Sequence, residues 1–242
     1  MSLDSFFIQL GKSLLLTTLT RTKKKSQQLL ILIGFLLGIS PVMALEIITI
    51  EKTENHHMLK TRAENIQFPL NQEDKDLIEA MKKKLYALGG VGLAAPQVNS
   101  AKQIIAVYIP EEAQLLRDNA KIFPMHILIN PSYEPLPHTR IISDFEGCYS
   151  VSSKAGKVPR YDEIQLKYYD EEGNAHQQIE NGFYARVLQH EIDHLNGVLI
   201  TDRLTPDCVQ GTIEEMMVIR RAELPVEKRK LFDQIMAKKQ KK

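Results

Sequence analysis

Three chemically demanding side chains lie within one short segment late in the chain. His190, Glu191 and His194 form an H-E-x-x-H pattern. If residues 181–196 are helical, the two imidazoles lie one turn apart on the same face and can bind one divalent metal. Glu191 then lies beside the metal, where its carboxylate can take a proton from an activated water and return it to a leaving group. A single helical histidine is more often an ordinary buried residue, but this pair with a glutamate favours a metal site.

A hydrolytic metal centre of this kind needs a third protein ligand and one open position. The extended pattern H-E-x-x-H-x-x-G-x-x-H matches Gly197, but its last histidine falls at Ile200, so this possibility fails. Glu214 lies twenty residues after His194, as in thermolysin-like proteases, although its neighbours do not repeat that pattern. Cys148, on a predicted loop well upstream, would complete a chemically sound Cys/His/His set.

Three helices are predicted around these residues. Apolar residues between 183 and 194 recur with the helical period and Gly197 follows as a stop, which predicts a helix over 181–196. A second helix is predicted over 71–88, with Asn71 as its cap and Gly89 at its end. A third is predicted to begin at Thr205-Pro206 and to be interrupted by Pro225. The apolar stripe of the second helix, which we expect in the core, is Leu77, Met81, Leu85 and Leu88.

Strand signals lie between these helices. Residues 103–109 and 127–130 are predicted to be buried strands, and the second is expected to end at the prolines Pro131, Pro135 and Pro137. Residues 164–169 and 175–179 are predicted to form a hairpin across a polar turn. The order of elements indicates an α+β fold in which antiparallel sheets pack around a central metal-binding helix, with a C-terminal helical tail.

Composition limits the class of protein. The chain has 242 residues, of which 43% are hydrophobic and 25% charged, enough for one substantial domain. The formal net charge of +1 gives no reason to expect DNA as a partner. Cys148 and Cys208 are the only cysteines, so a disulfide scaffold is not expected.

Three short motifs occur in a fixed order along the chain. They are Gly-Val-Gly-Leu-Ala-Ala-Pro-Gln at 90–97, Glu-Gly-Cys-Tyr-Ser at 146–150 and His-Glu-Ile-Asp-His at 190–194. Together they closely resemble the three motifs of peptide deformylases, and the resemblance covers roughly residues 45–205. It implies a metal-dependent hydrolase that removes the N-formyl group from the N-terminal methionine of newly synthesised polypeptides and releases formate.

The resemblance also implies residue roles. It makes Cys148, His190 and His194 the metal ligands and Glu191 the proton carrier. It assigns stabilisation of the oxyanion to the side chain of Gln97 and the backbone N–H of Tyr149. Coordination rules alone favour zinc, whereas the resemblance implies one Fe²⁺ per chain, with Zn²⁺, Ni²⁺ or Co²⁺ as substitutes.

Other residues are expected to bind the substrate or steady the ligands. The backbone of Gly92 is expected to bind the peptide, and Gly90 and Gly92 to adopt dihedrals that other residues disfavour. An ion pair between Glu146 and Arg160 is expected to steady the cysteine loop. The apolar pocket for the methionine side chain is expected to include Val91, Phe145, Phe183 and Val187.

Two other functions remain open at this point. A zinc-type metallopeptidase would use Glu214 as its third ligand, and a non-catalytic paralogue would bind peptide termini without turnover. Substitution of Cys148 separates the first alternative from a deformylase, because only a deformylase then loses its metal. An assay of formate release, with a Glu191 variant as the control, separates the non-catalytic paralogue from a deformylase.

We expect three parts in the chain: an N-terminal extension at 1–44, a deformylase catalytic domain at 45–205 and a helical, basic tail at 206–242. The extension has a charged stretch, an apolar run and a small residue, and so resembles a secretory signal. We favour instead a start at Met43 and a cytoplasmic protein, because nascent chains are deformylated where ribosomes are. If residues 1–44 are retained, the protein is expected to be exported or membrane-associated. The basic tail is expected to be solvated, and the more specific alternative is that it contacts ribosomal RNA.

Overall fold

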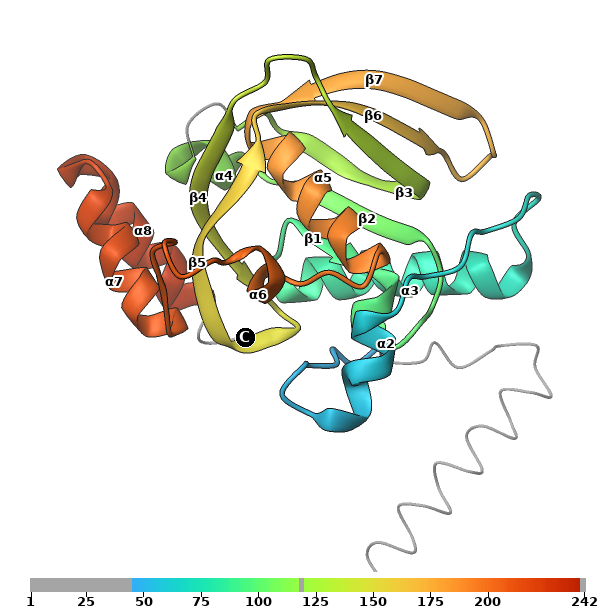
Figure 1. Cartoon of the computed structure of the whole chain (residues 1–242), viewed down its shortest axis with the longest axis horizontal. Coiled ribbons are helices and arrows are strands. Elements are labelled where there is room, and N and C mark those ends of the chain that lie inside the picture. The colour runs from blue at the N-terminus through green and yellow to red at the C-terminus, as the bar shows by residue number, and fades with distance from the viewer. Residues whose placement is uncertain (1–44, 118–119, 240–242) are drawn as a thin grey trace, which may run out of the picture. The chain divides into compact units, whose positions relative to one another are not determined.

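Two antiparallel sheets lie on either side of the helix that carries the H-E-x-x-H pattern (Figure 1). The computed structural model describes residues 45–117 and 120–239. The larger sheet has the strand order β1-β2-β3-β6-β7, and the smaller has the order β4-β5-β8. The pattern lies on α5, which contacts strands of both sheets. The expected α+β fold with antiparallel sheets around a central helix is therefore confirmed.

The strands of the larger sheet are β1 (Gly92–Ala94), β2 (Ile104–Ile109), β3 (Phe123–Pro135), β6 (Glu163–Tyr169) and β7 (Ala175–Asn181). Those of the smaller sheet are β4 (Ile141–Cys148), β5 (Val151–Tyr161) and β8 (Gln210–Gly211). The α-helices are α2 (His56–Lys60), α3 (Gln72–Leu88), α4 (Glu111–Leu116), α5 (Gly182–Leu195), α6 (Ile200–Arg203), α7 (Ile213–Glu223) and α8 (Val226–Lys239). Two short 3-10 helices, η1 (Thr53–Asn55) and η2 (Ala95–Val98), complete the described elements.

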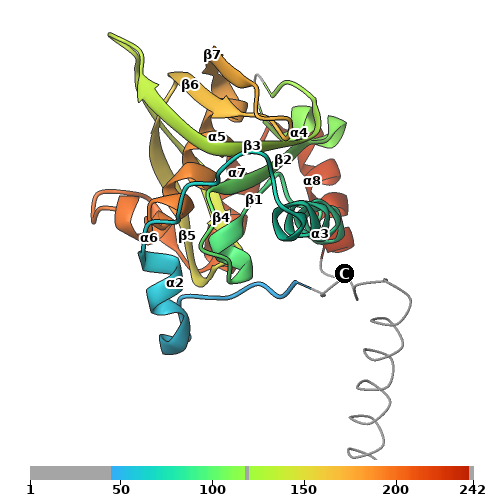
Figure 2. The ribbon, with the colours of Figure 1, turned by 90° about the vertical axis from the view of Figure 1, so that its right-hand side faces the viewer.

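The strand β2 separates two apolar clusters because its alternate side chains point to opposite faces. Ile105 and Val107 lie in the cluster that contains the apolar residues of α5. Ile104 and Ala106 lie in the cluster that contains the apolar residues of α3. Figure 2 shows β1 and β2 between these two helices. β1, which carries part of the first motif and pairs with β2, likewise places Ala94 in the first cluster and Leu93 in the second.

The second predicted helix is present as α3, but its buried face is shifted. The side chain of Asn71 caps it by accepting a hydrogen bond from the backbone N–H of Asp74 at 2.9 Å. Gly89 ends it in the left-handed conformation with φ 62°. The fully buried apolar residues are Ile78, Met81 and Leu85, whereas the predicted Leu77 and Leu88 are half-buried. Ile78 is therefore the member of the stripe that the prediction missed.

Pro131 does not end the second strand, in contrast to the prediction, whereas Pro135 does. β3 continues through Pro131 to Pro135. Asn130 has a φ of 49°, and the pairing of β3 with β6 shifts its register between Ile129 and Ser132. Such a bulge leaves one residue outside the hydrogen-bond ladder, which is where a strand tolerates proline.

The cysteine motif lies on a hairpin that was predicted to be a loop. Cys148 is the last residue of β4, and Tyr149 and Ser150 form the tight turn to β5. β4 and β5 pair over most of their length. Glycine and charged residues interrupt the apolar pattern of both strands, so the sequence signal for strands is weak there. The hairpin fixes the cysteine more firmly than a loop would.

The third predicted helix begins later than expected. Thr205 accepts a hydrogen bond from the backbone N–H of Cys208 at 3.0 Å, which closes a turn in place of a helical start. The chain then forms β8, and α7 begins after Thr212. Thr212 and Glu215 form a reciprocal capping box with bonds of 3.2 and 2.8 Å, a start signal that the prediction overlooked. Pro225 separates α7 from α8, as predicted.

The expectations for residues 1–44 lie outside the described residues. Residues 45–117 and 120–239 contain no helix that is long and apolar enough to cross a membrane. The expected division at 45, 205 and 206 stays a prediction.

Candidate metal centre

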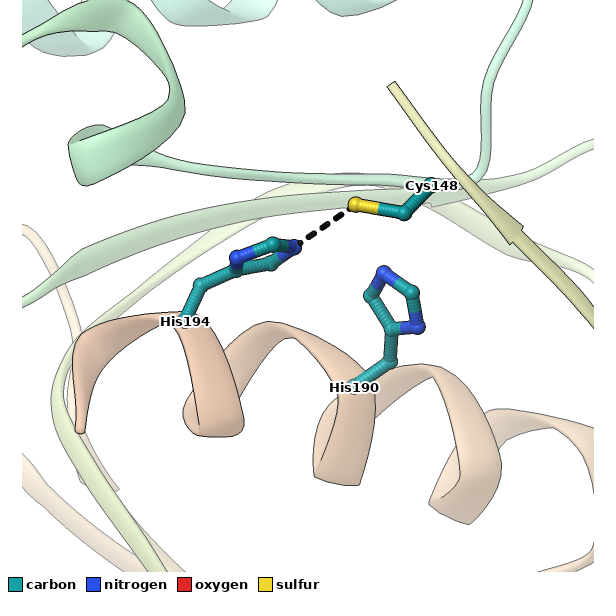
Figure 3. Close-up of side chains that lie close together, drawn as sticks. All are labelled: Cys148, His190 and His194. Carbon is teal, nitrogen blue, oxygen red and sulfur yellow. Dashed lines mark hydrogen bonds between the residues drawn. The ribbon is translucent and has the colours of Figure 1, made fainter. Parts of the chain in front are cut away.

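Cys148 from β4 and two histidines from α5 meet at one point (Figure 3). One donor atom from each of Cys148, His190 and His194 lies within 4.8 Å of the other two. The Sγ atom of Cys148 lies 3.2 Å from Nε2 of His194. The two imidazoles lie one helical turn apart on the same face of α5, because of their i, i+4 spacing.

The surroundings of these three side chains fit a divalent metal. Burial lowers the pKa of His194 well below its usual value, which keeps an imidazole lone pair available for coordination. The Sγ atom of Cys148 accepts hydrogen bonds from the backbone N–H of Ser150 at 3.4 Å and from Nε2 of Gln97 at 3.7 Å. One thiolate and two imidazoles suit zinc or iron(II) better than the harder magnesium or calcium ions.

Glu214 does not take part in this cluster. It lies on α7 with an exposed side chain, and it does not belong to the group of donor atoms around Cys148. The arrangement of a metallopeptidase with Glu214 as third ligand is therefore not present in the described part of the chain.

Glu146 orients His190 from behind. Its Oε2 atom lies 2.9 Å from Nδ1 of His190, which leaves Nε2 of the ring facing the cysteine. Arg160 donates to both carboxylate oxygens of Glu146 at 3.0 and 2.9 Å, and Arg186 donates to Oε1 at 2.7 Å. Burial opposes ionisation, but the hydrogen bond from His190 and the charge of Arg160 hold the pKa of Glu146 well below its usual range. The structure thus brings Glu146 and Arg160 together, as the sequence suggested.

Asp193, three residues after His190 on α5, extends this network. Arg160 donates to Oδ2 of Asp193, and Arg203 donates to both oxygens of the same carboxylate at 3.0 and 2.5 Å. Both Arg160 and Asp193 are buried. A continuous chain of charged groups therefore connects α6 with the imidazole of His190.

Glu191 is packed against the first motif. Its side chain is buried, and burial raises its pKa to about 7. A Cβ atom added to Gly92 would lie only 2.2 Å from Oε1 of Glu191. Position 92 therefore has no room for a side chain while the carboxylate occupies this place.

Gly90 and Gly92 of the first motif are needed because a side chain would not fit at either position, and not because of unusual backbone dihedrals. Neither Gly90 nor Gly92 has a positive φ, which corrects the expectation of restricted dihedrals there. A Cβ atom at Gly90 would lie 2.9 Å from Cε2 of Tyr149. The hydroxyl of Tyr149 donates to the carbonyl oxygen of Leu88 at 3.2 Å, so its ring lies across the turn that ends α3.

Gln97 is held in place from both ends. It lies in η2, where its Oε1 atom accepts a hydrogen bond from the backbone N–H of Ala94 at 2.9 Å. Because Oε1 is the acceptor, Nε2 is the donor end of the amide, and it faces Sγ of Cys148. Gln97 is 1% exposed, so its donor group points into the site and not into solvent.

One cavity of about 790 Å³ opens on these groups. Gln97, Cys148, Tyr149, His190 and Glu191 line one part of it. All four residues predicted for the methionine pocket line it as well: Val91, Phe145, Phe183 and Val187. Residues from α7 and α8, which were expected to form a solvated tail, complete the wall.

Sequence reasoning missed two charged residues of the centre, Arg186 and Asp193. Both lie on α5 and are buried, and Arg186 also donates to the backbone oxygens of Val158 and Ile142 at 2.7 and 2.5 Å. The sequence does contain a signal for them: charged residues lie within a helix that is otherwise apolar, and such residues are almost never buried without partners. The partners themselves come from β4, β5 and α6, which no local pattern connects to α5.

Comparisons with known proteins agree with this geometry. A family profile described as polypeptide deformylase matches residues 46–210. Peptide deformylase 2 of Rickettsia conorii is 38% identical over 189 residues, which cover 76% of this chain and 92% of that protein. A peptide deformylase of Ligilactobacillus salivarius is 40% identical over 163 residues, covering 62% of this chain and 86% of that protein. The crystal structure of a class I type b peptide deformylase from Acinetobacter baumannii with bound Met-Ala-Ser superimposes with a TM-score of 0.58 at 29% identity, covering 68% of this chain and all of that one.

Proposed function

The chain belongs to the polypeptide deformylase family, and from this premise we propose how its own residues hydrolyse the formyl group of an N-terminal formylmethionine. The family consists of metal-dependent hydrolases. The observation that carries the proposal is the meeting of Cys148, His190 and His194 beside the buried Glu191, at one end of a cavity. The products are formate and a peptide with a free amino terminus.

Cys148, His190 and His194 would hold one divalent cation per chain, and we assign Fe²⁺ to it. When bound, such a cation acts as a Lewis acid and lowers the pKa of a water molecule in the site. Zn²⁺, Ni²⁺ and Co²⁺ suit the same donors and are the expected substitutes. Metal analysis after anaerobic purification, paired with activity, tests the assignment. A zinc-loaded protein that is fully active while the iron-loaded protein is inactive would overturn it.

Glu191 carries the proton between the attacking water and the leaving amine. Its pKa of about 7 lies near neutral pH, which lets the carboxylate accept a proton and the acid return it. Gly92 leaves room for the carboxylate, because the carboxylate fills the space that any side chain at position 92 would need.

Gln97 and the turn after the cysteine stabilise the negative charge that develops on the formyl oxygen. The hydrogen bond from Ala94 fixes the amide of Gln97 with Nε2 as its donor end, and Nε2 lies 3.7 Å from Sγ of Cys148. The backbone N–H of Tyr149 is assigned as the second donor. Fixed donors cost no reorganisation when the oxyanion forms, and removal of one typically slows an enzyme by about 10² to 10³.

The substrate is a peptide that begins with formylmethionine. The backbone of Gly92 is proposed to bind the peptide main chain, and the methionine side chain to enter the apolar part of the cavity at Val91, Phe145, Phe183 and Val187. A Met-Ala-Ser peptide occupies the related protein from Acinetobacter baumannii, which makes a tripeptide a suitable test substrate.

Formate release from formyl-Met-Ala-Ser by the anaerobically purified, Fe²⁺-supplied protein tests the proposal. We expect release by the wild type and a loss of at least about 10² in kcat for Glu191→Ala, because the proton carrier is absent. Absence of release by the wild type would instead favour a module that binds peptide termini without turnover.

The place of action is proposed to be the ribosome in the cytoplasm. The basic residues near the C-terminus, which include the exposed Lys230, are proposed to contact ribosomal RNA. Co-sedimentation with ribosomes should then weaken steeply as salt rises. Unchanged co-sedimentation at low salt after truncation behind Leu231, combined with Lys230→Ala, would remove this part of the proposal.

A further inference from the structure

The helices α7 and α8 follow the last residue that the family profile matches, yet they lie at the cavity. The match ends at residue 210, and α7 begins at Ile213. Figure 1 shows both helices beside the β4–β5 hairpin that carries the cysteine. Six apolar side chains of this pair, together with Arg220, line the same cavity as the catalytic groups: Ile213, Met216, Met217, Phe232, Ile235 and Met236.

Ion pairs hold α7 against the hairpin. Lys157 on β5 pairs with Glu223 on α7 at 2.7 Å. Arg220 on α7 pairs with Asp144 on β4 at 3.2 Å, and its guanidinium lies 5.0 Å from the ring centre of Phe145. These contacts fix α7 to both strands of the hairpin.

Packing and a second set of ionic contacts hold α8 to α7. Arg221 on α7 donates to both oxygens of Asp233 on α8 at 2.7 and 2.9 Å. Phe232 is 4% exposed, and Met216 forms a buried cluster with Phe145 and Ala155. The helix pair is therefore a fixed wall of the cavity and not a free tail.

The chemistry of this wall points to an apolar ligand. Phe145, which is expected to contact the methionine side chain, packs directly against Met216, so the wall continues the proposed methionine pocket. A cavity of about 790 Å³ lies in the upper part of the range of ligand pockets, roughly 300 to 1,000 Å³, and has room for more than one side chain. Methionine side chains are flexible and polarizable, so they adapt to apolar groups of different shape.

We propose that α7 and α8 form a second apolar subsite, which receives a large apolar side chain at one of the two residues that follow formylmethionine. This inference rests on the proposed function, because it names the preferred substrate of the same site. The segment that lies outside the family match thereby sets the sequence preference of this enzyme.

The test compares kcat/KM for formyl-Met-Ala-Ala with the values for formyl-Met-Leu-Ala, formyl-Met-Ala-Leu and the corresponding lysine peptides. For the wild type we expect one of the two leucine peptides to be favoured over its alanine and lysine counterparts by roughly tenfold or more. Met217→Glu places a negative charge in the wall without touching a metal ligand. We expect it to abolish the preference for leucine and to raise the preference for lysine at the same position by about tenfold.

Matched controls separate this effect from general damage. Val218 on α7 is 69% exposed and lies outside the cavity lining, so Val218→Glu should keep the wild-type preference. Ile235→Glu repeats the change on α8, with the exposed Gln234→Glu as its control, in case one helix does not tolerate the charge.

The outcomes distinguish the subsite from the deformylase activity itself. Formate release from every peptide with the same selectivity in the wild type and both cavity variants would overturn the subsite and leave the deformylase activity intact. Release from no peptide by the wild type would overturn the proposed function, and the subsite with it. A loss of leucine preference in both Val218→Glu and Met217→Glu would likewise refute a role specific to the cavity wall.

Discussion

The tight contact between Gly92 and Glu191 leads to a sharp prediction. In Gly92→Ala the new Cβ would lie 2.2 Å from Oε1, 2.6 Å from Cδ and 2.7 Å from Cγ of Glu191. Since real Cβ contacts essentially never fall below 3.0 Å, the carboxylate or the strand must move by about 0.8 Å. A misplacement of about 1 Å at a reacting group can cost on the order of 10² in rate.

We therefore expect kcat of Gly92→Ala to fall about 100-fold, with metal content at the wild-type level. Formate release and bound metal are measured on the same samples, and KM is determined to separate displacement of the base from weaker peptide binding. Gly90→Ala is the comparison, because its Cβ meets the outer edge of the Tyr149 ring and leaves Glu191 untouched; we expect a loss of less than about tenfold. A Gly92→Ala enzyme with kcat within about threefold of the wild type would refute the reasoning.

Three further predictions concern the ion network, acid stability and the choice of the third ligand. Arg160→Met removes an ion-pair partner from the buried carboxylates of Glu146 and Asp193 and should lower the free energy of unfolding by about 3 kcal/mol. Arg140→Met removes an exposed ion pair and should lower it by less than about 1 kcal/mol. Equal losses of the two variants in chemical denaturation would contradict this prediction. Although partial burial opposes ionisation, hydrogen bonds that include two backbone N–H groups of β5 lower the pKa of Glu51 to about 2. Its stabilisation is therefore fully present above pH 4.5 and is lost as the pH falls to about 2. Because the side chain is exposed and solvent screens its contacts, we expect a stability difference of no more than about 1 kcal/mol between wild type and Glu51→Gln at neutral pH, and this difference should vanish over this window in a series of denaturation curves. Cys148→Ser should weaken metal binding at least about tenfold, while Glu214→Ala should not change it; the reverse pattern in metal titrations would restore the metallopeptidase.

Local patterns were sufficient to predict the parts of the fold that short-range physics determines. The cap at Asn71, the left-handed Gly89 and the hairpin of β6 and β7 each depend on residues that are close in sequence. The i, i+4 spacing of the two histidines likewise places both rings on one face of a helix, whatever surrounds it.

The remaining features depend on contacts between distant segments. The course of β3 through Pro131 is set by pairing with β6, and no local pattern indicates that bulge. The burial of Arg186 depends on carbonyl oxygens of β4 and β5, and the role of α7 depends on a cavity formed mainly by other elements. Tertiary contacts such as these override local propensity, which is why the C-terminal helices were predicted to be a solvated tail.

X-ray absorption spectroscopy of the anaerobically prepared, Fe²⁺-loaded protein tests the Cys/His/His ligand set, because it distinguishes sulfur donors from nitrogen and oxygen donors around the metal. We expect one sulfur from Cys148 and two imidazole nitrogens from His190 and His194, with the sulfur contribution absent in Cys148→Ser. A spectrum of the wild type that contains only nitrogen and oxygen donors would contradict this expectation.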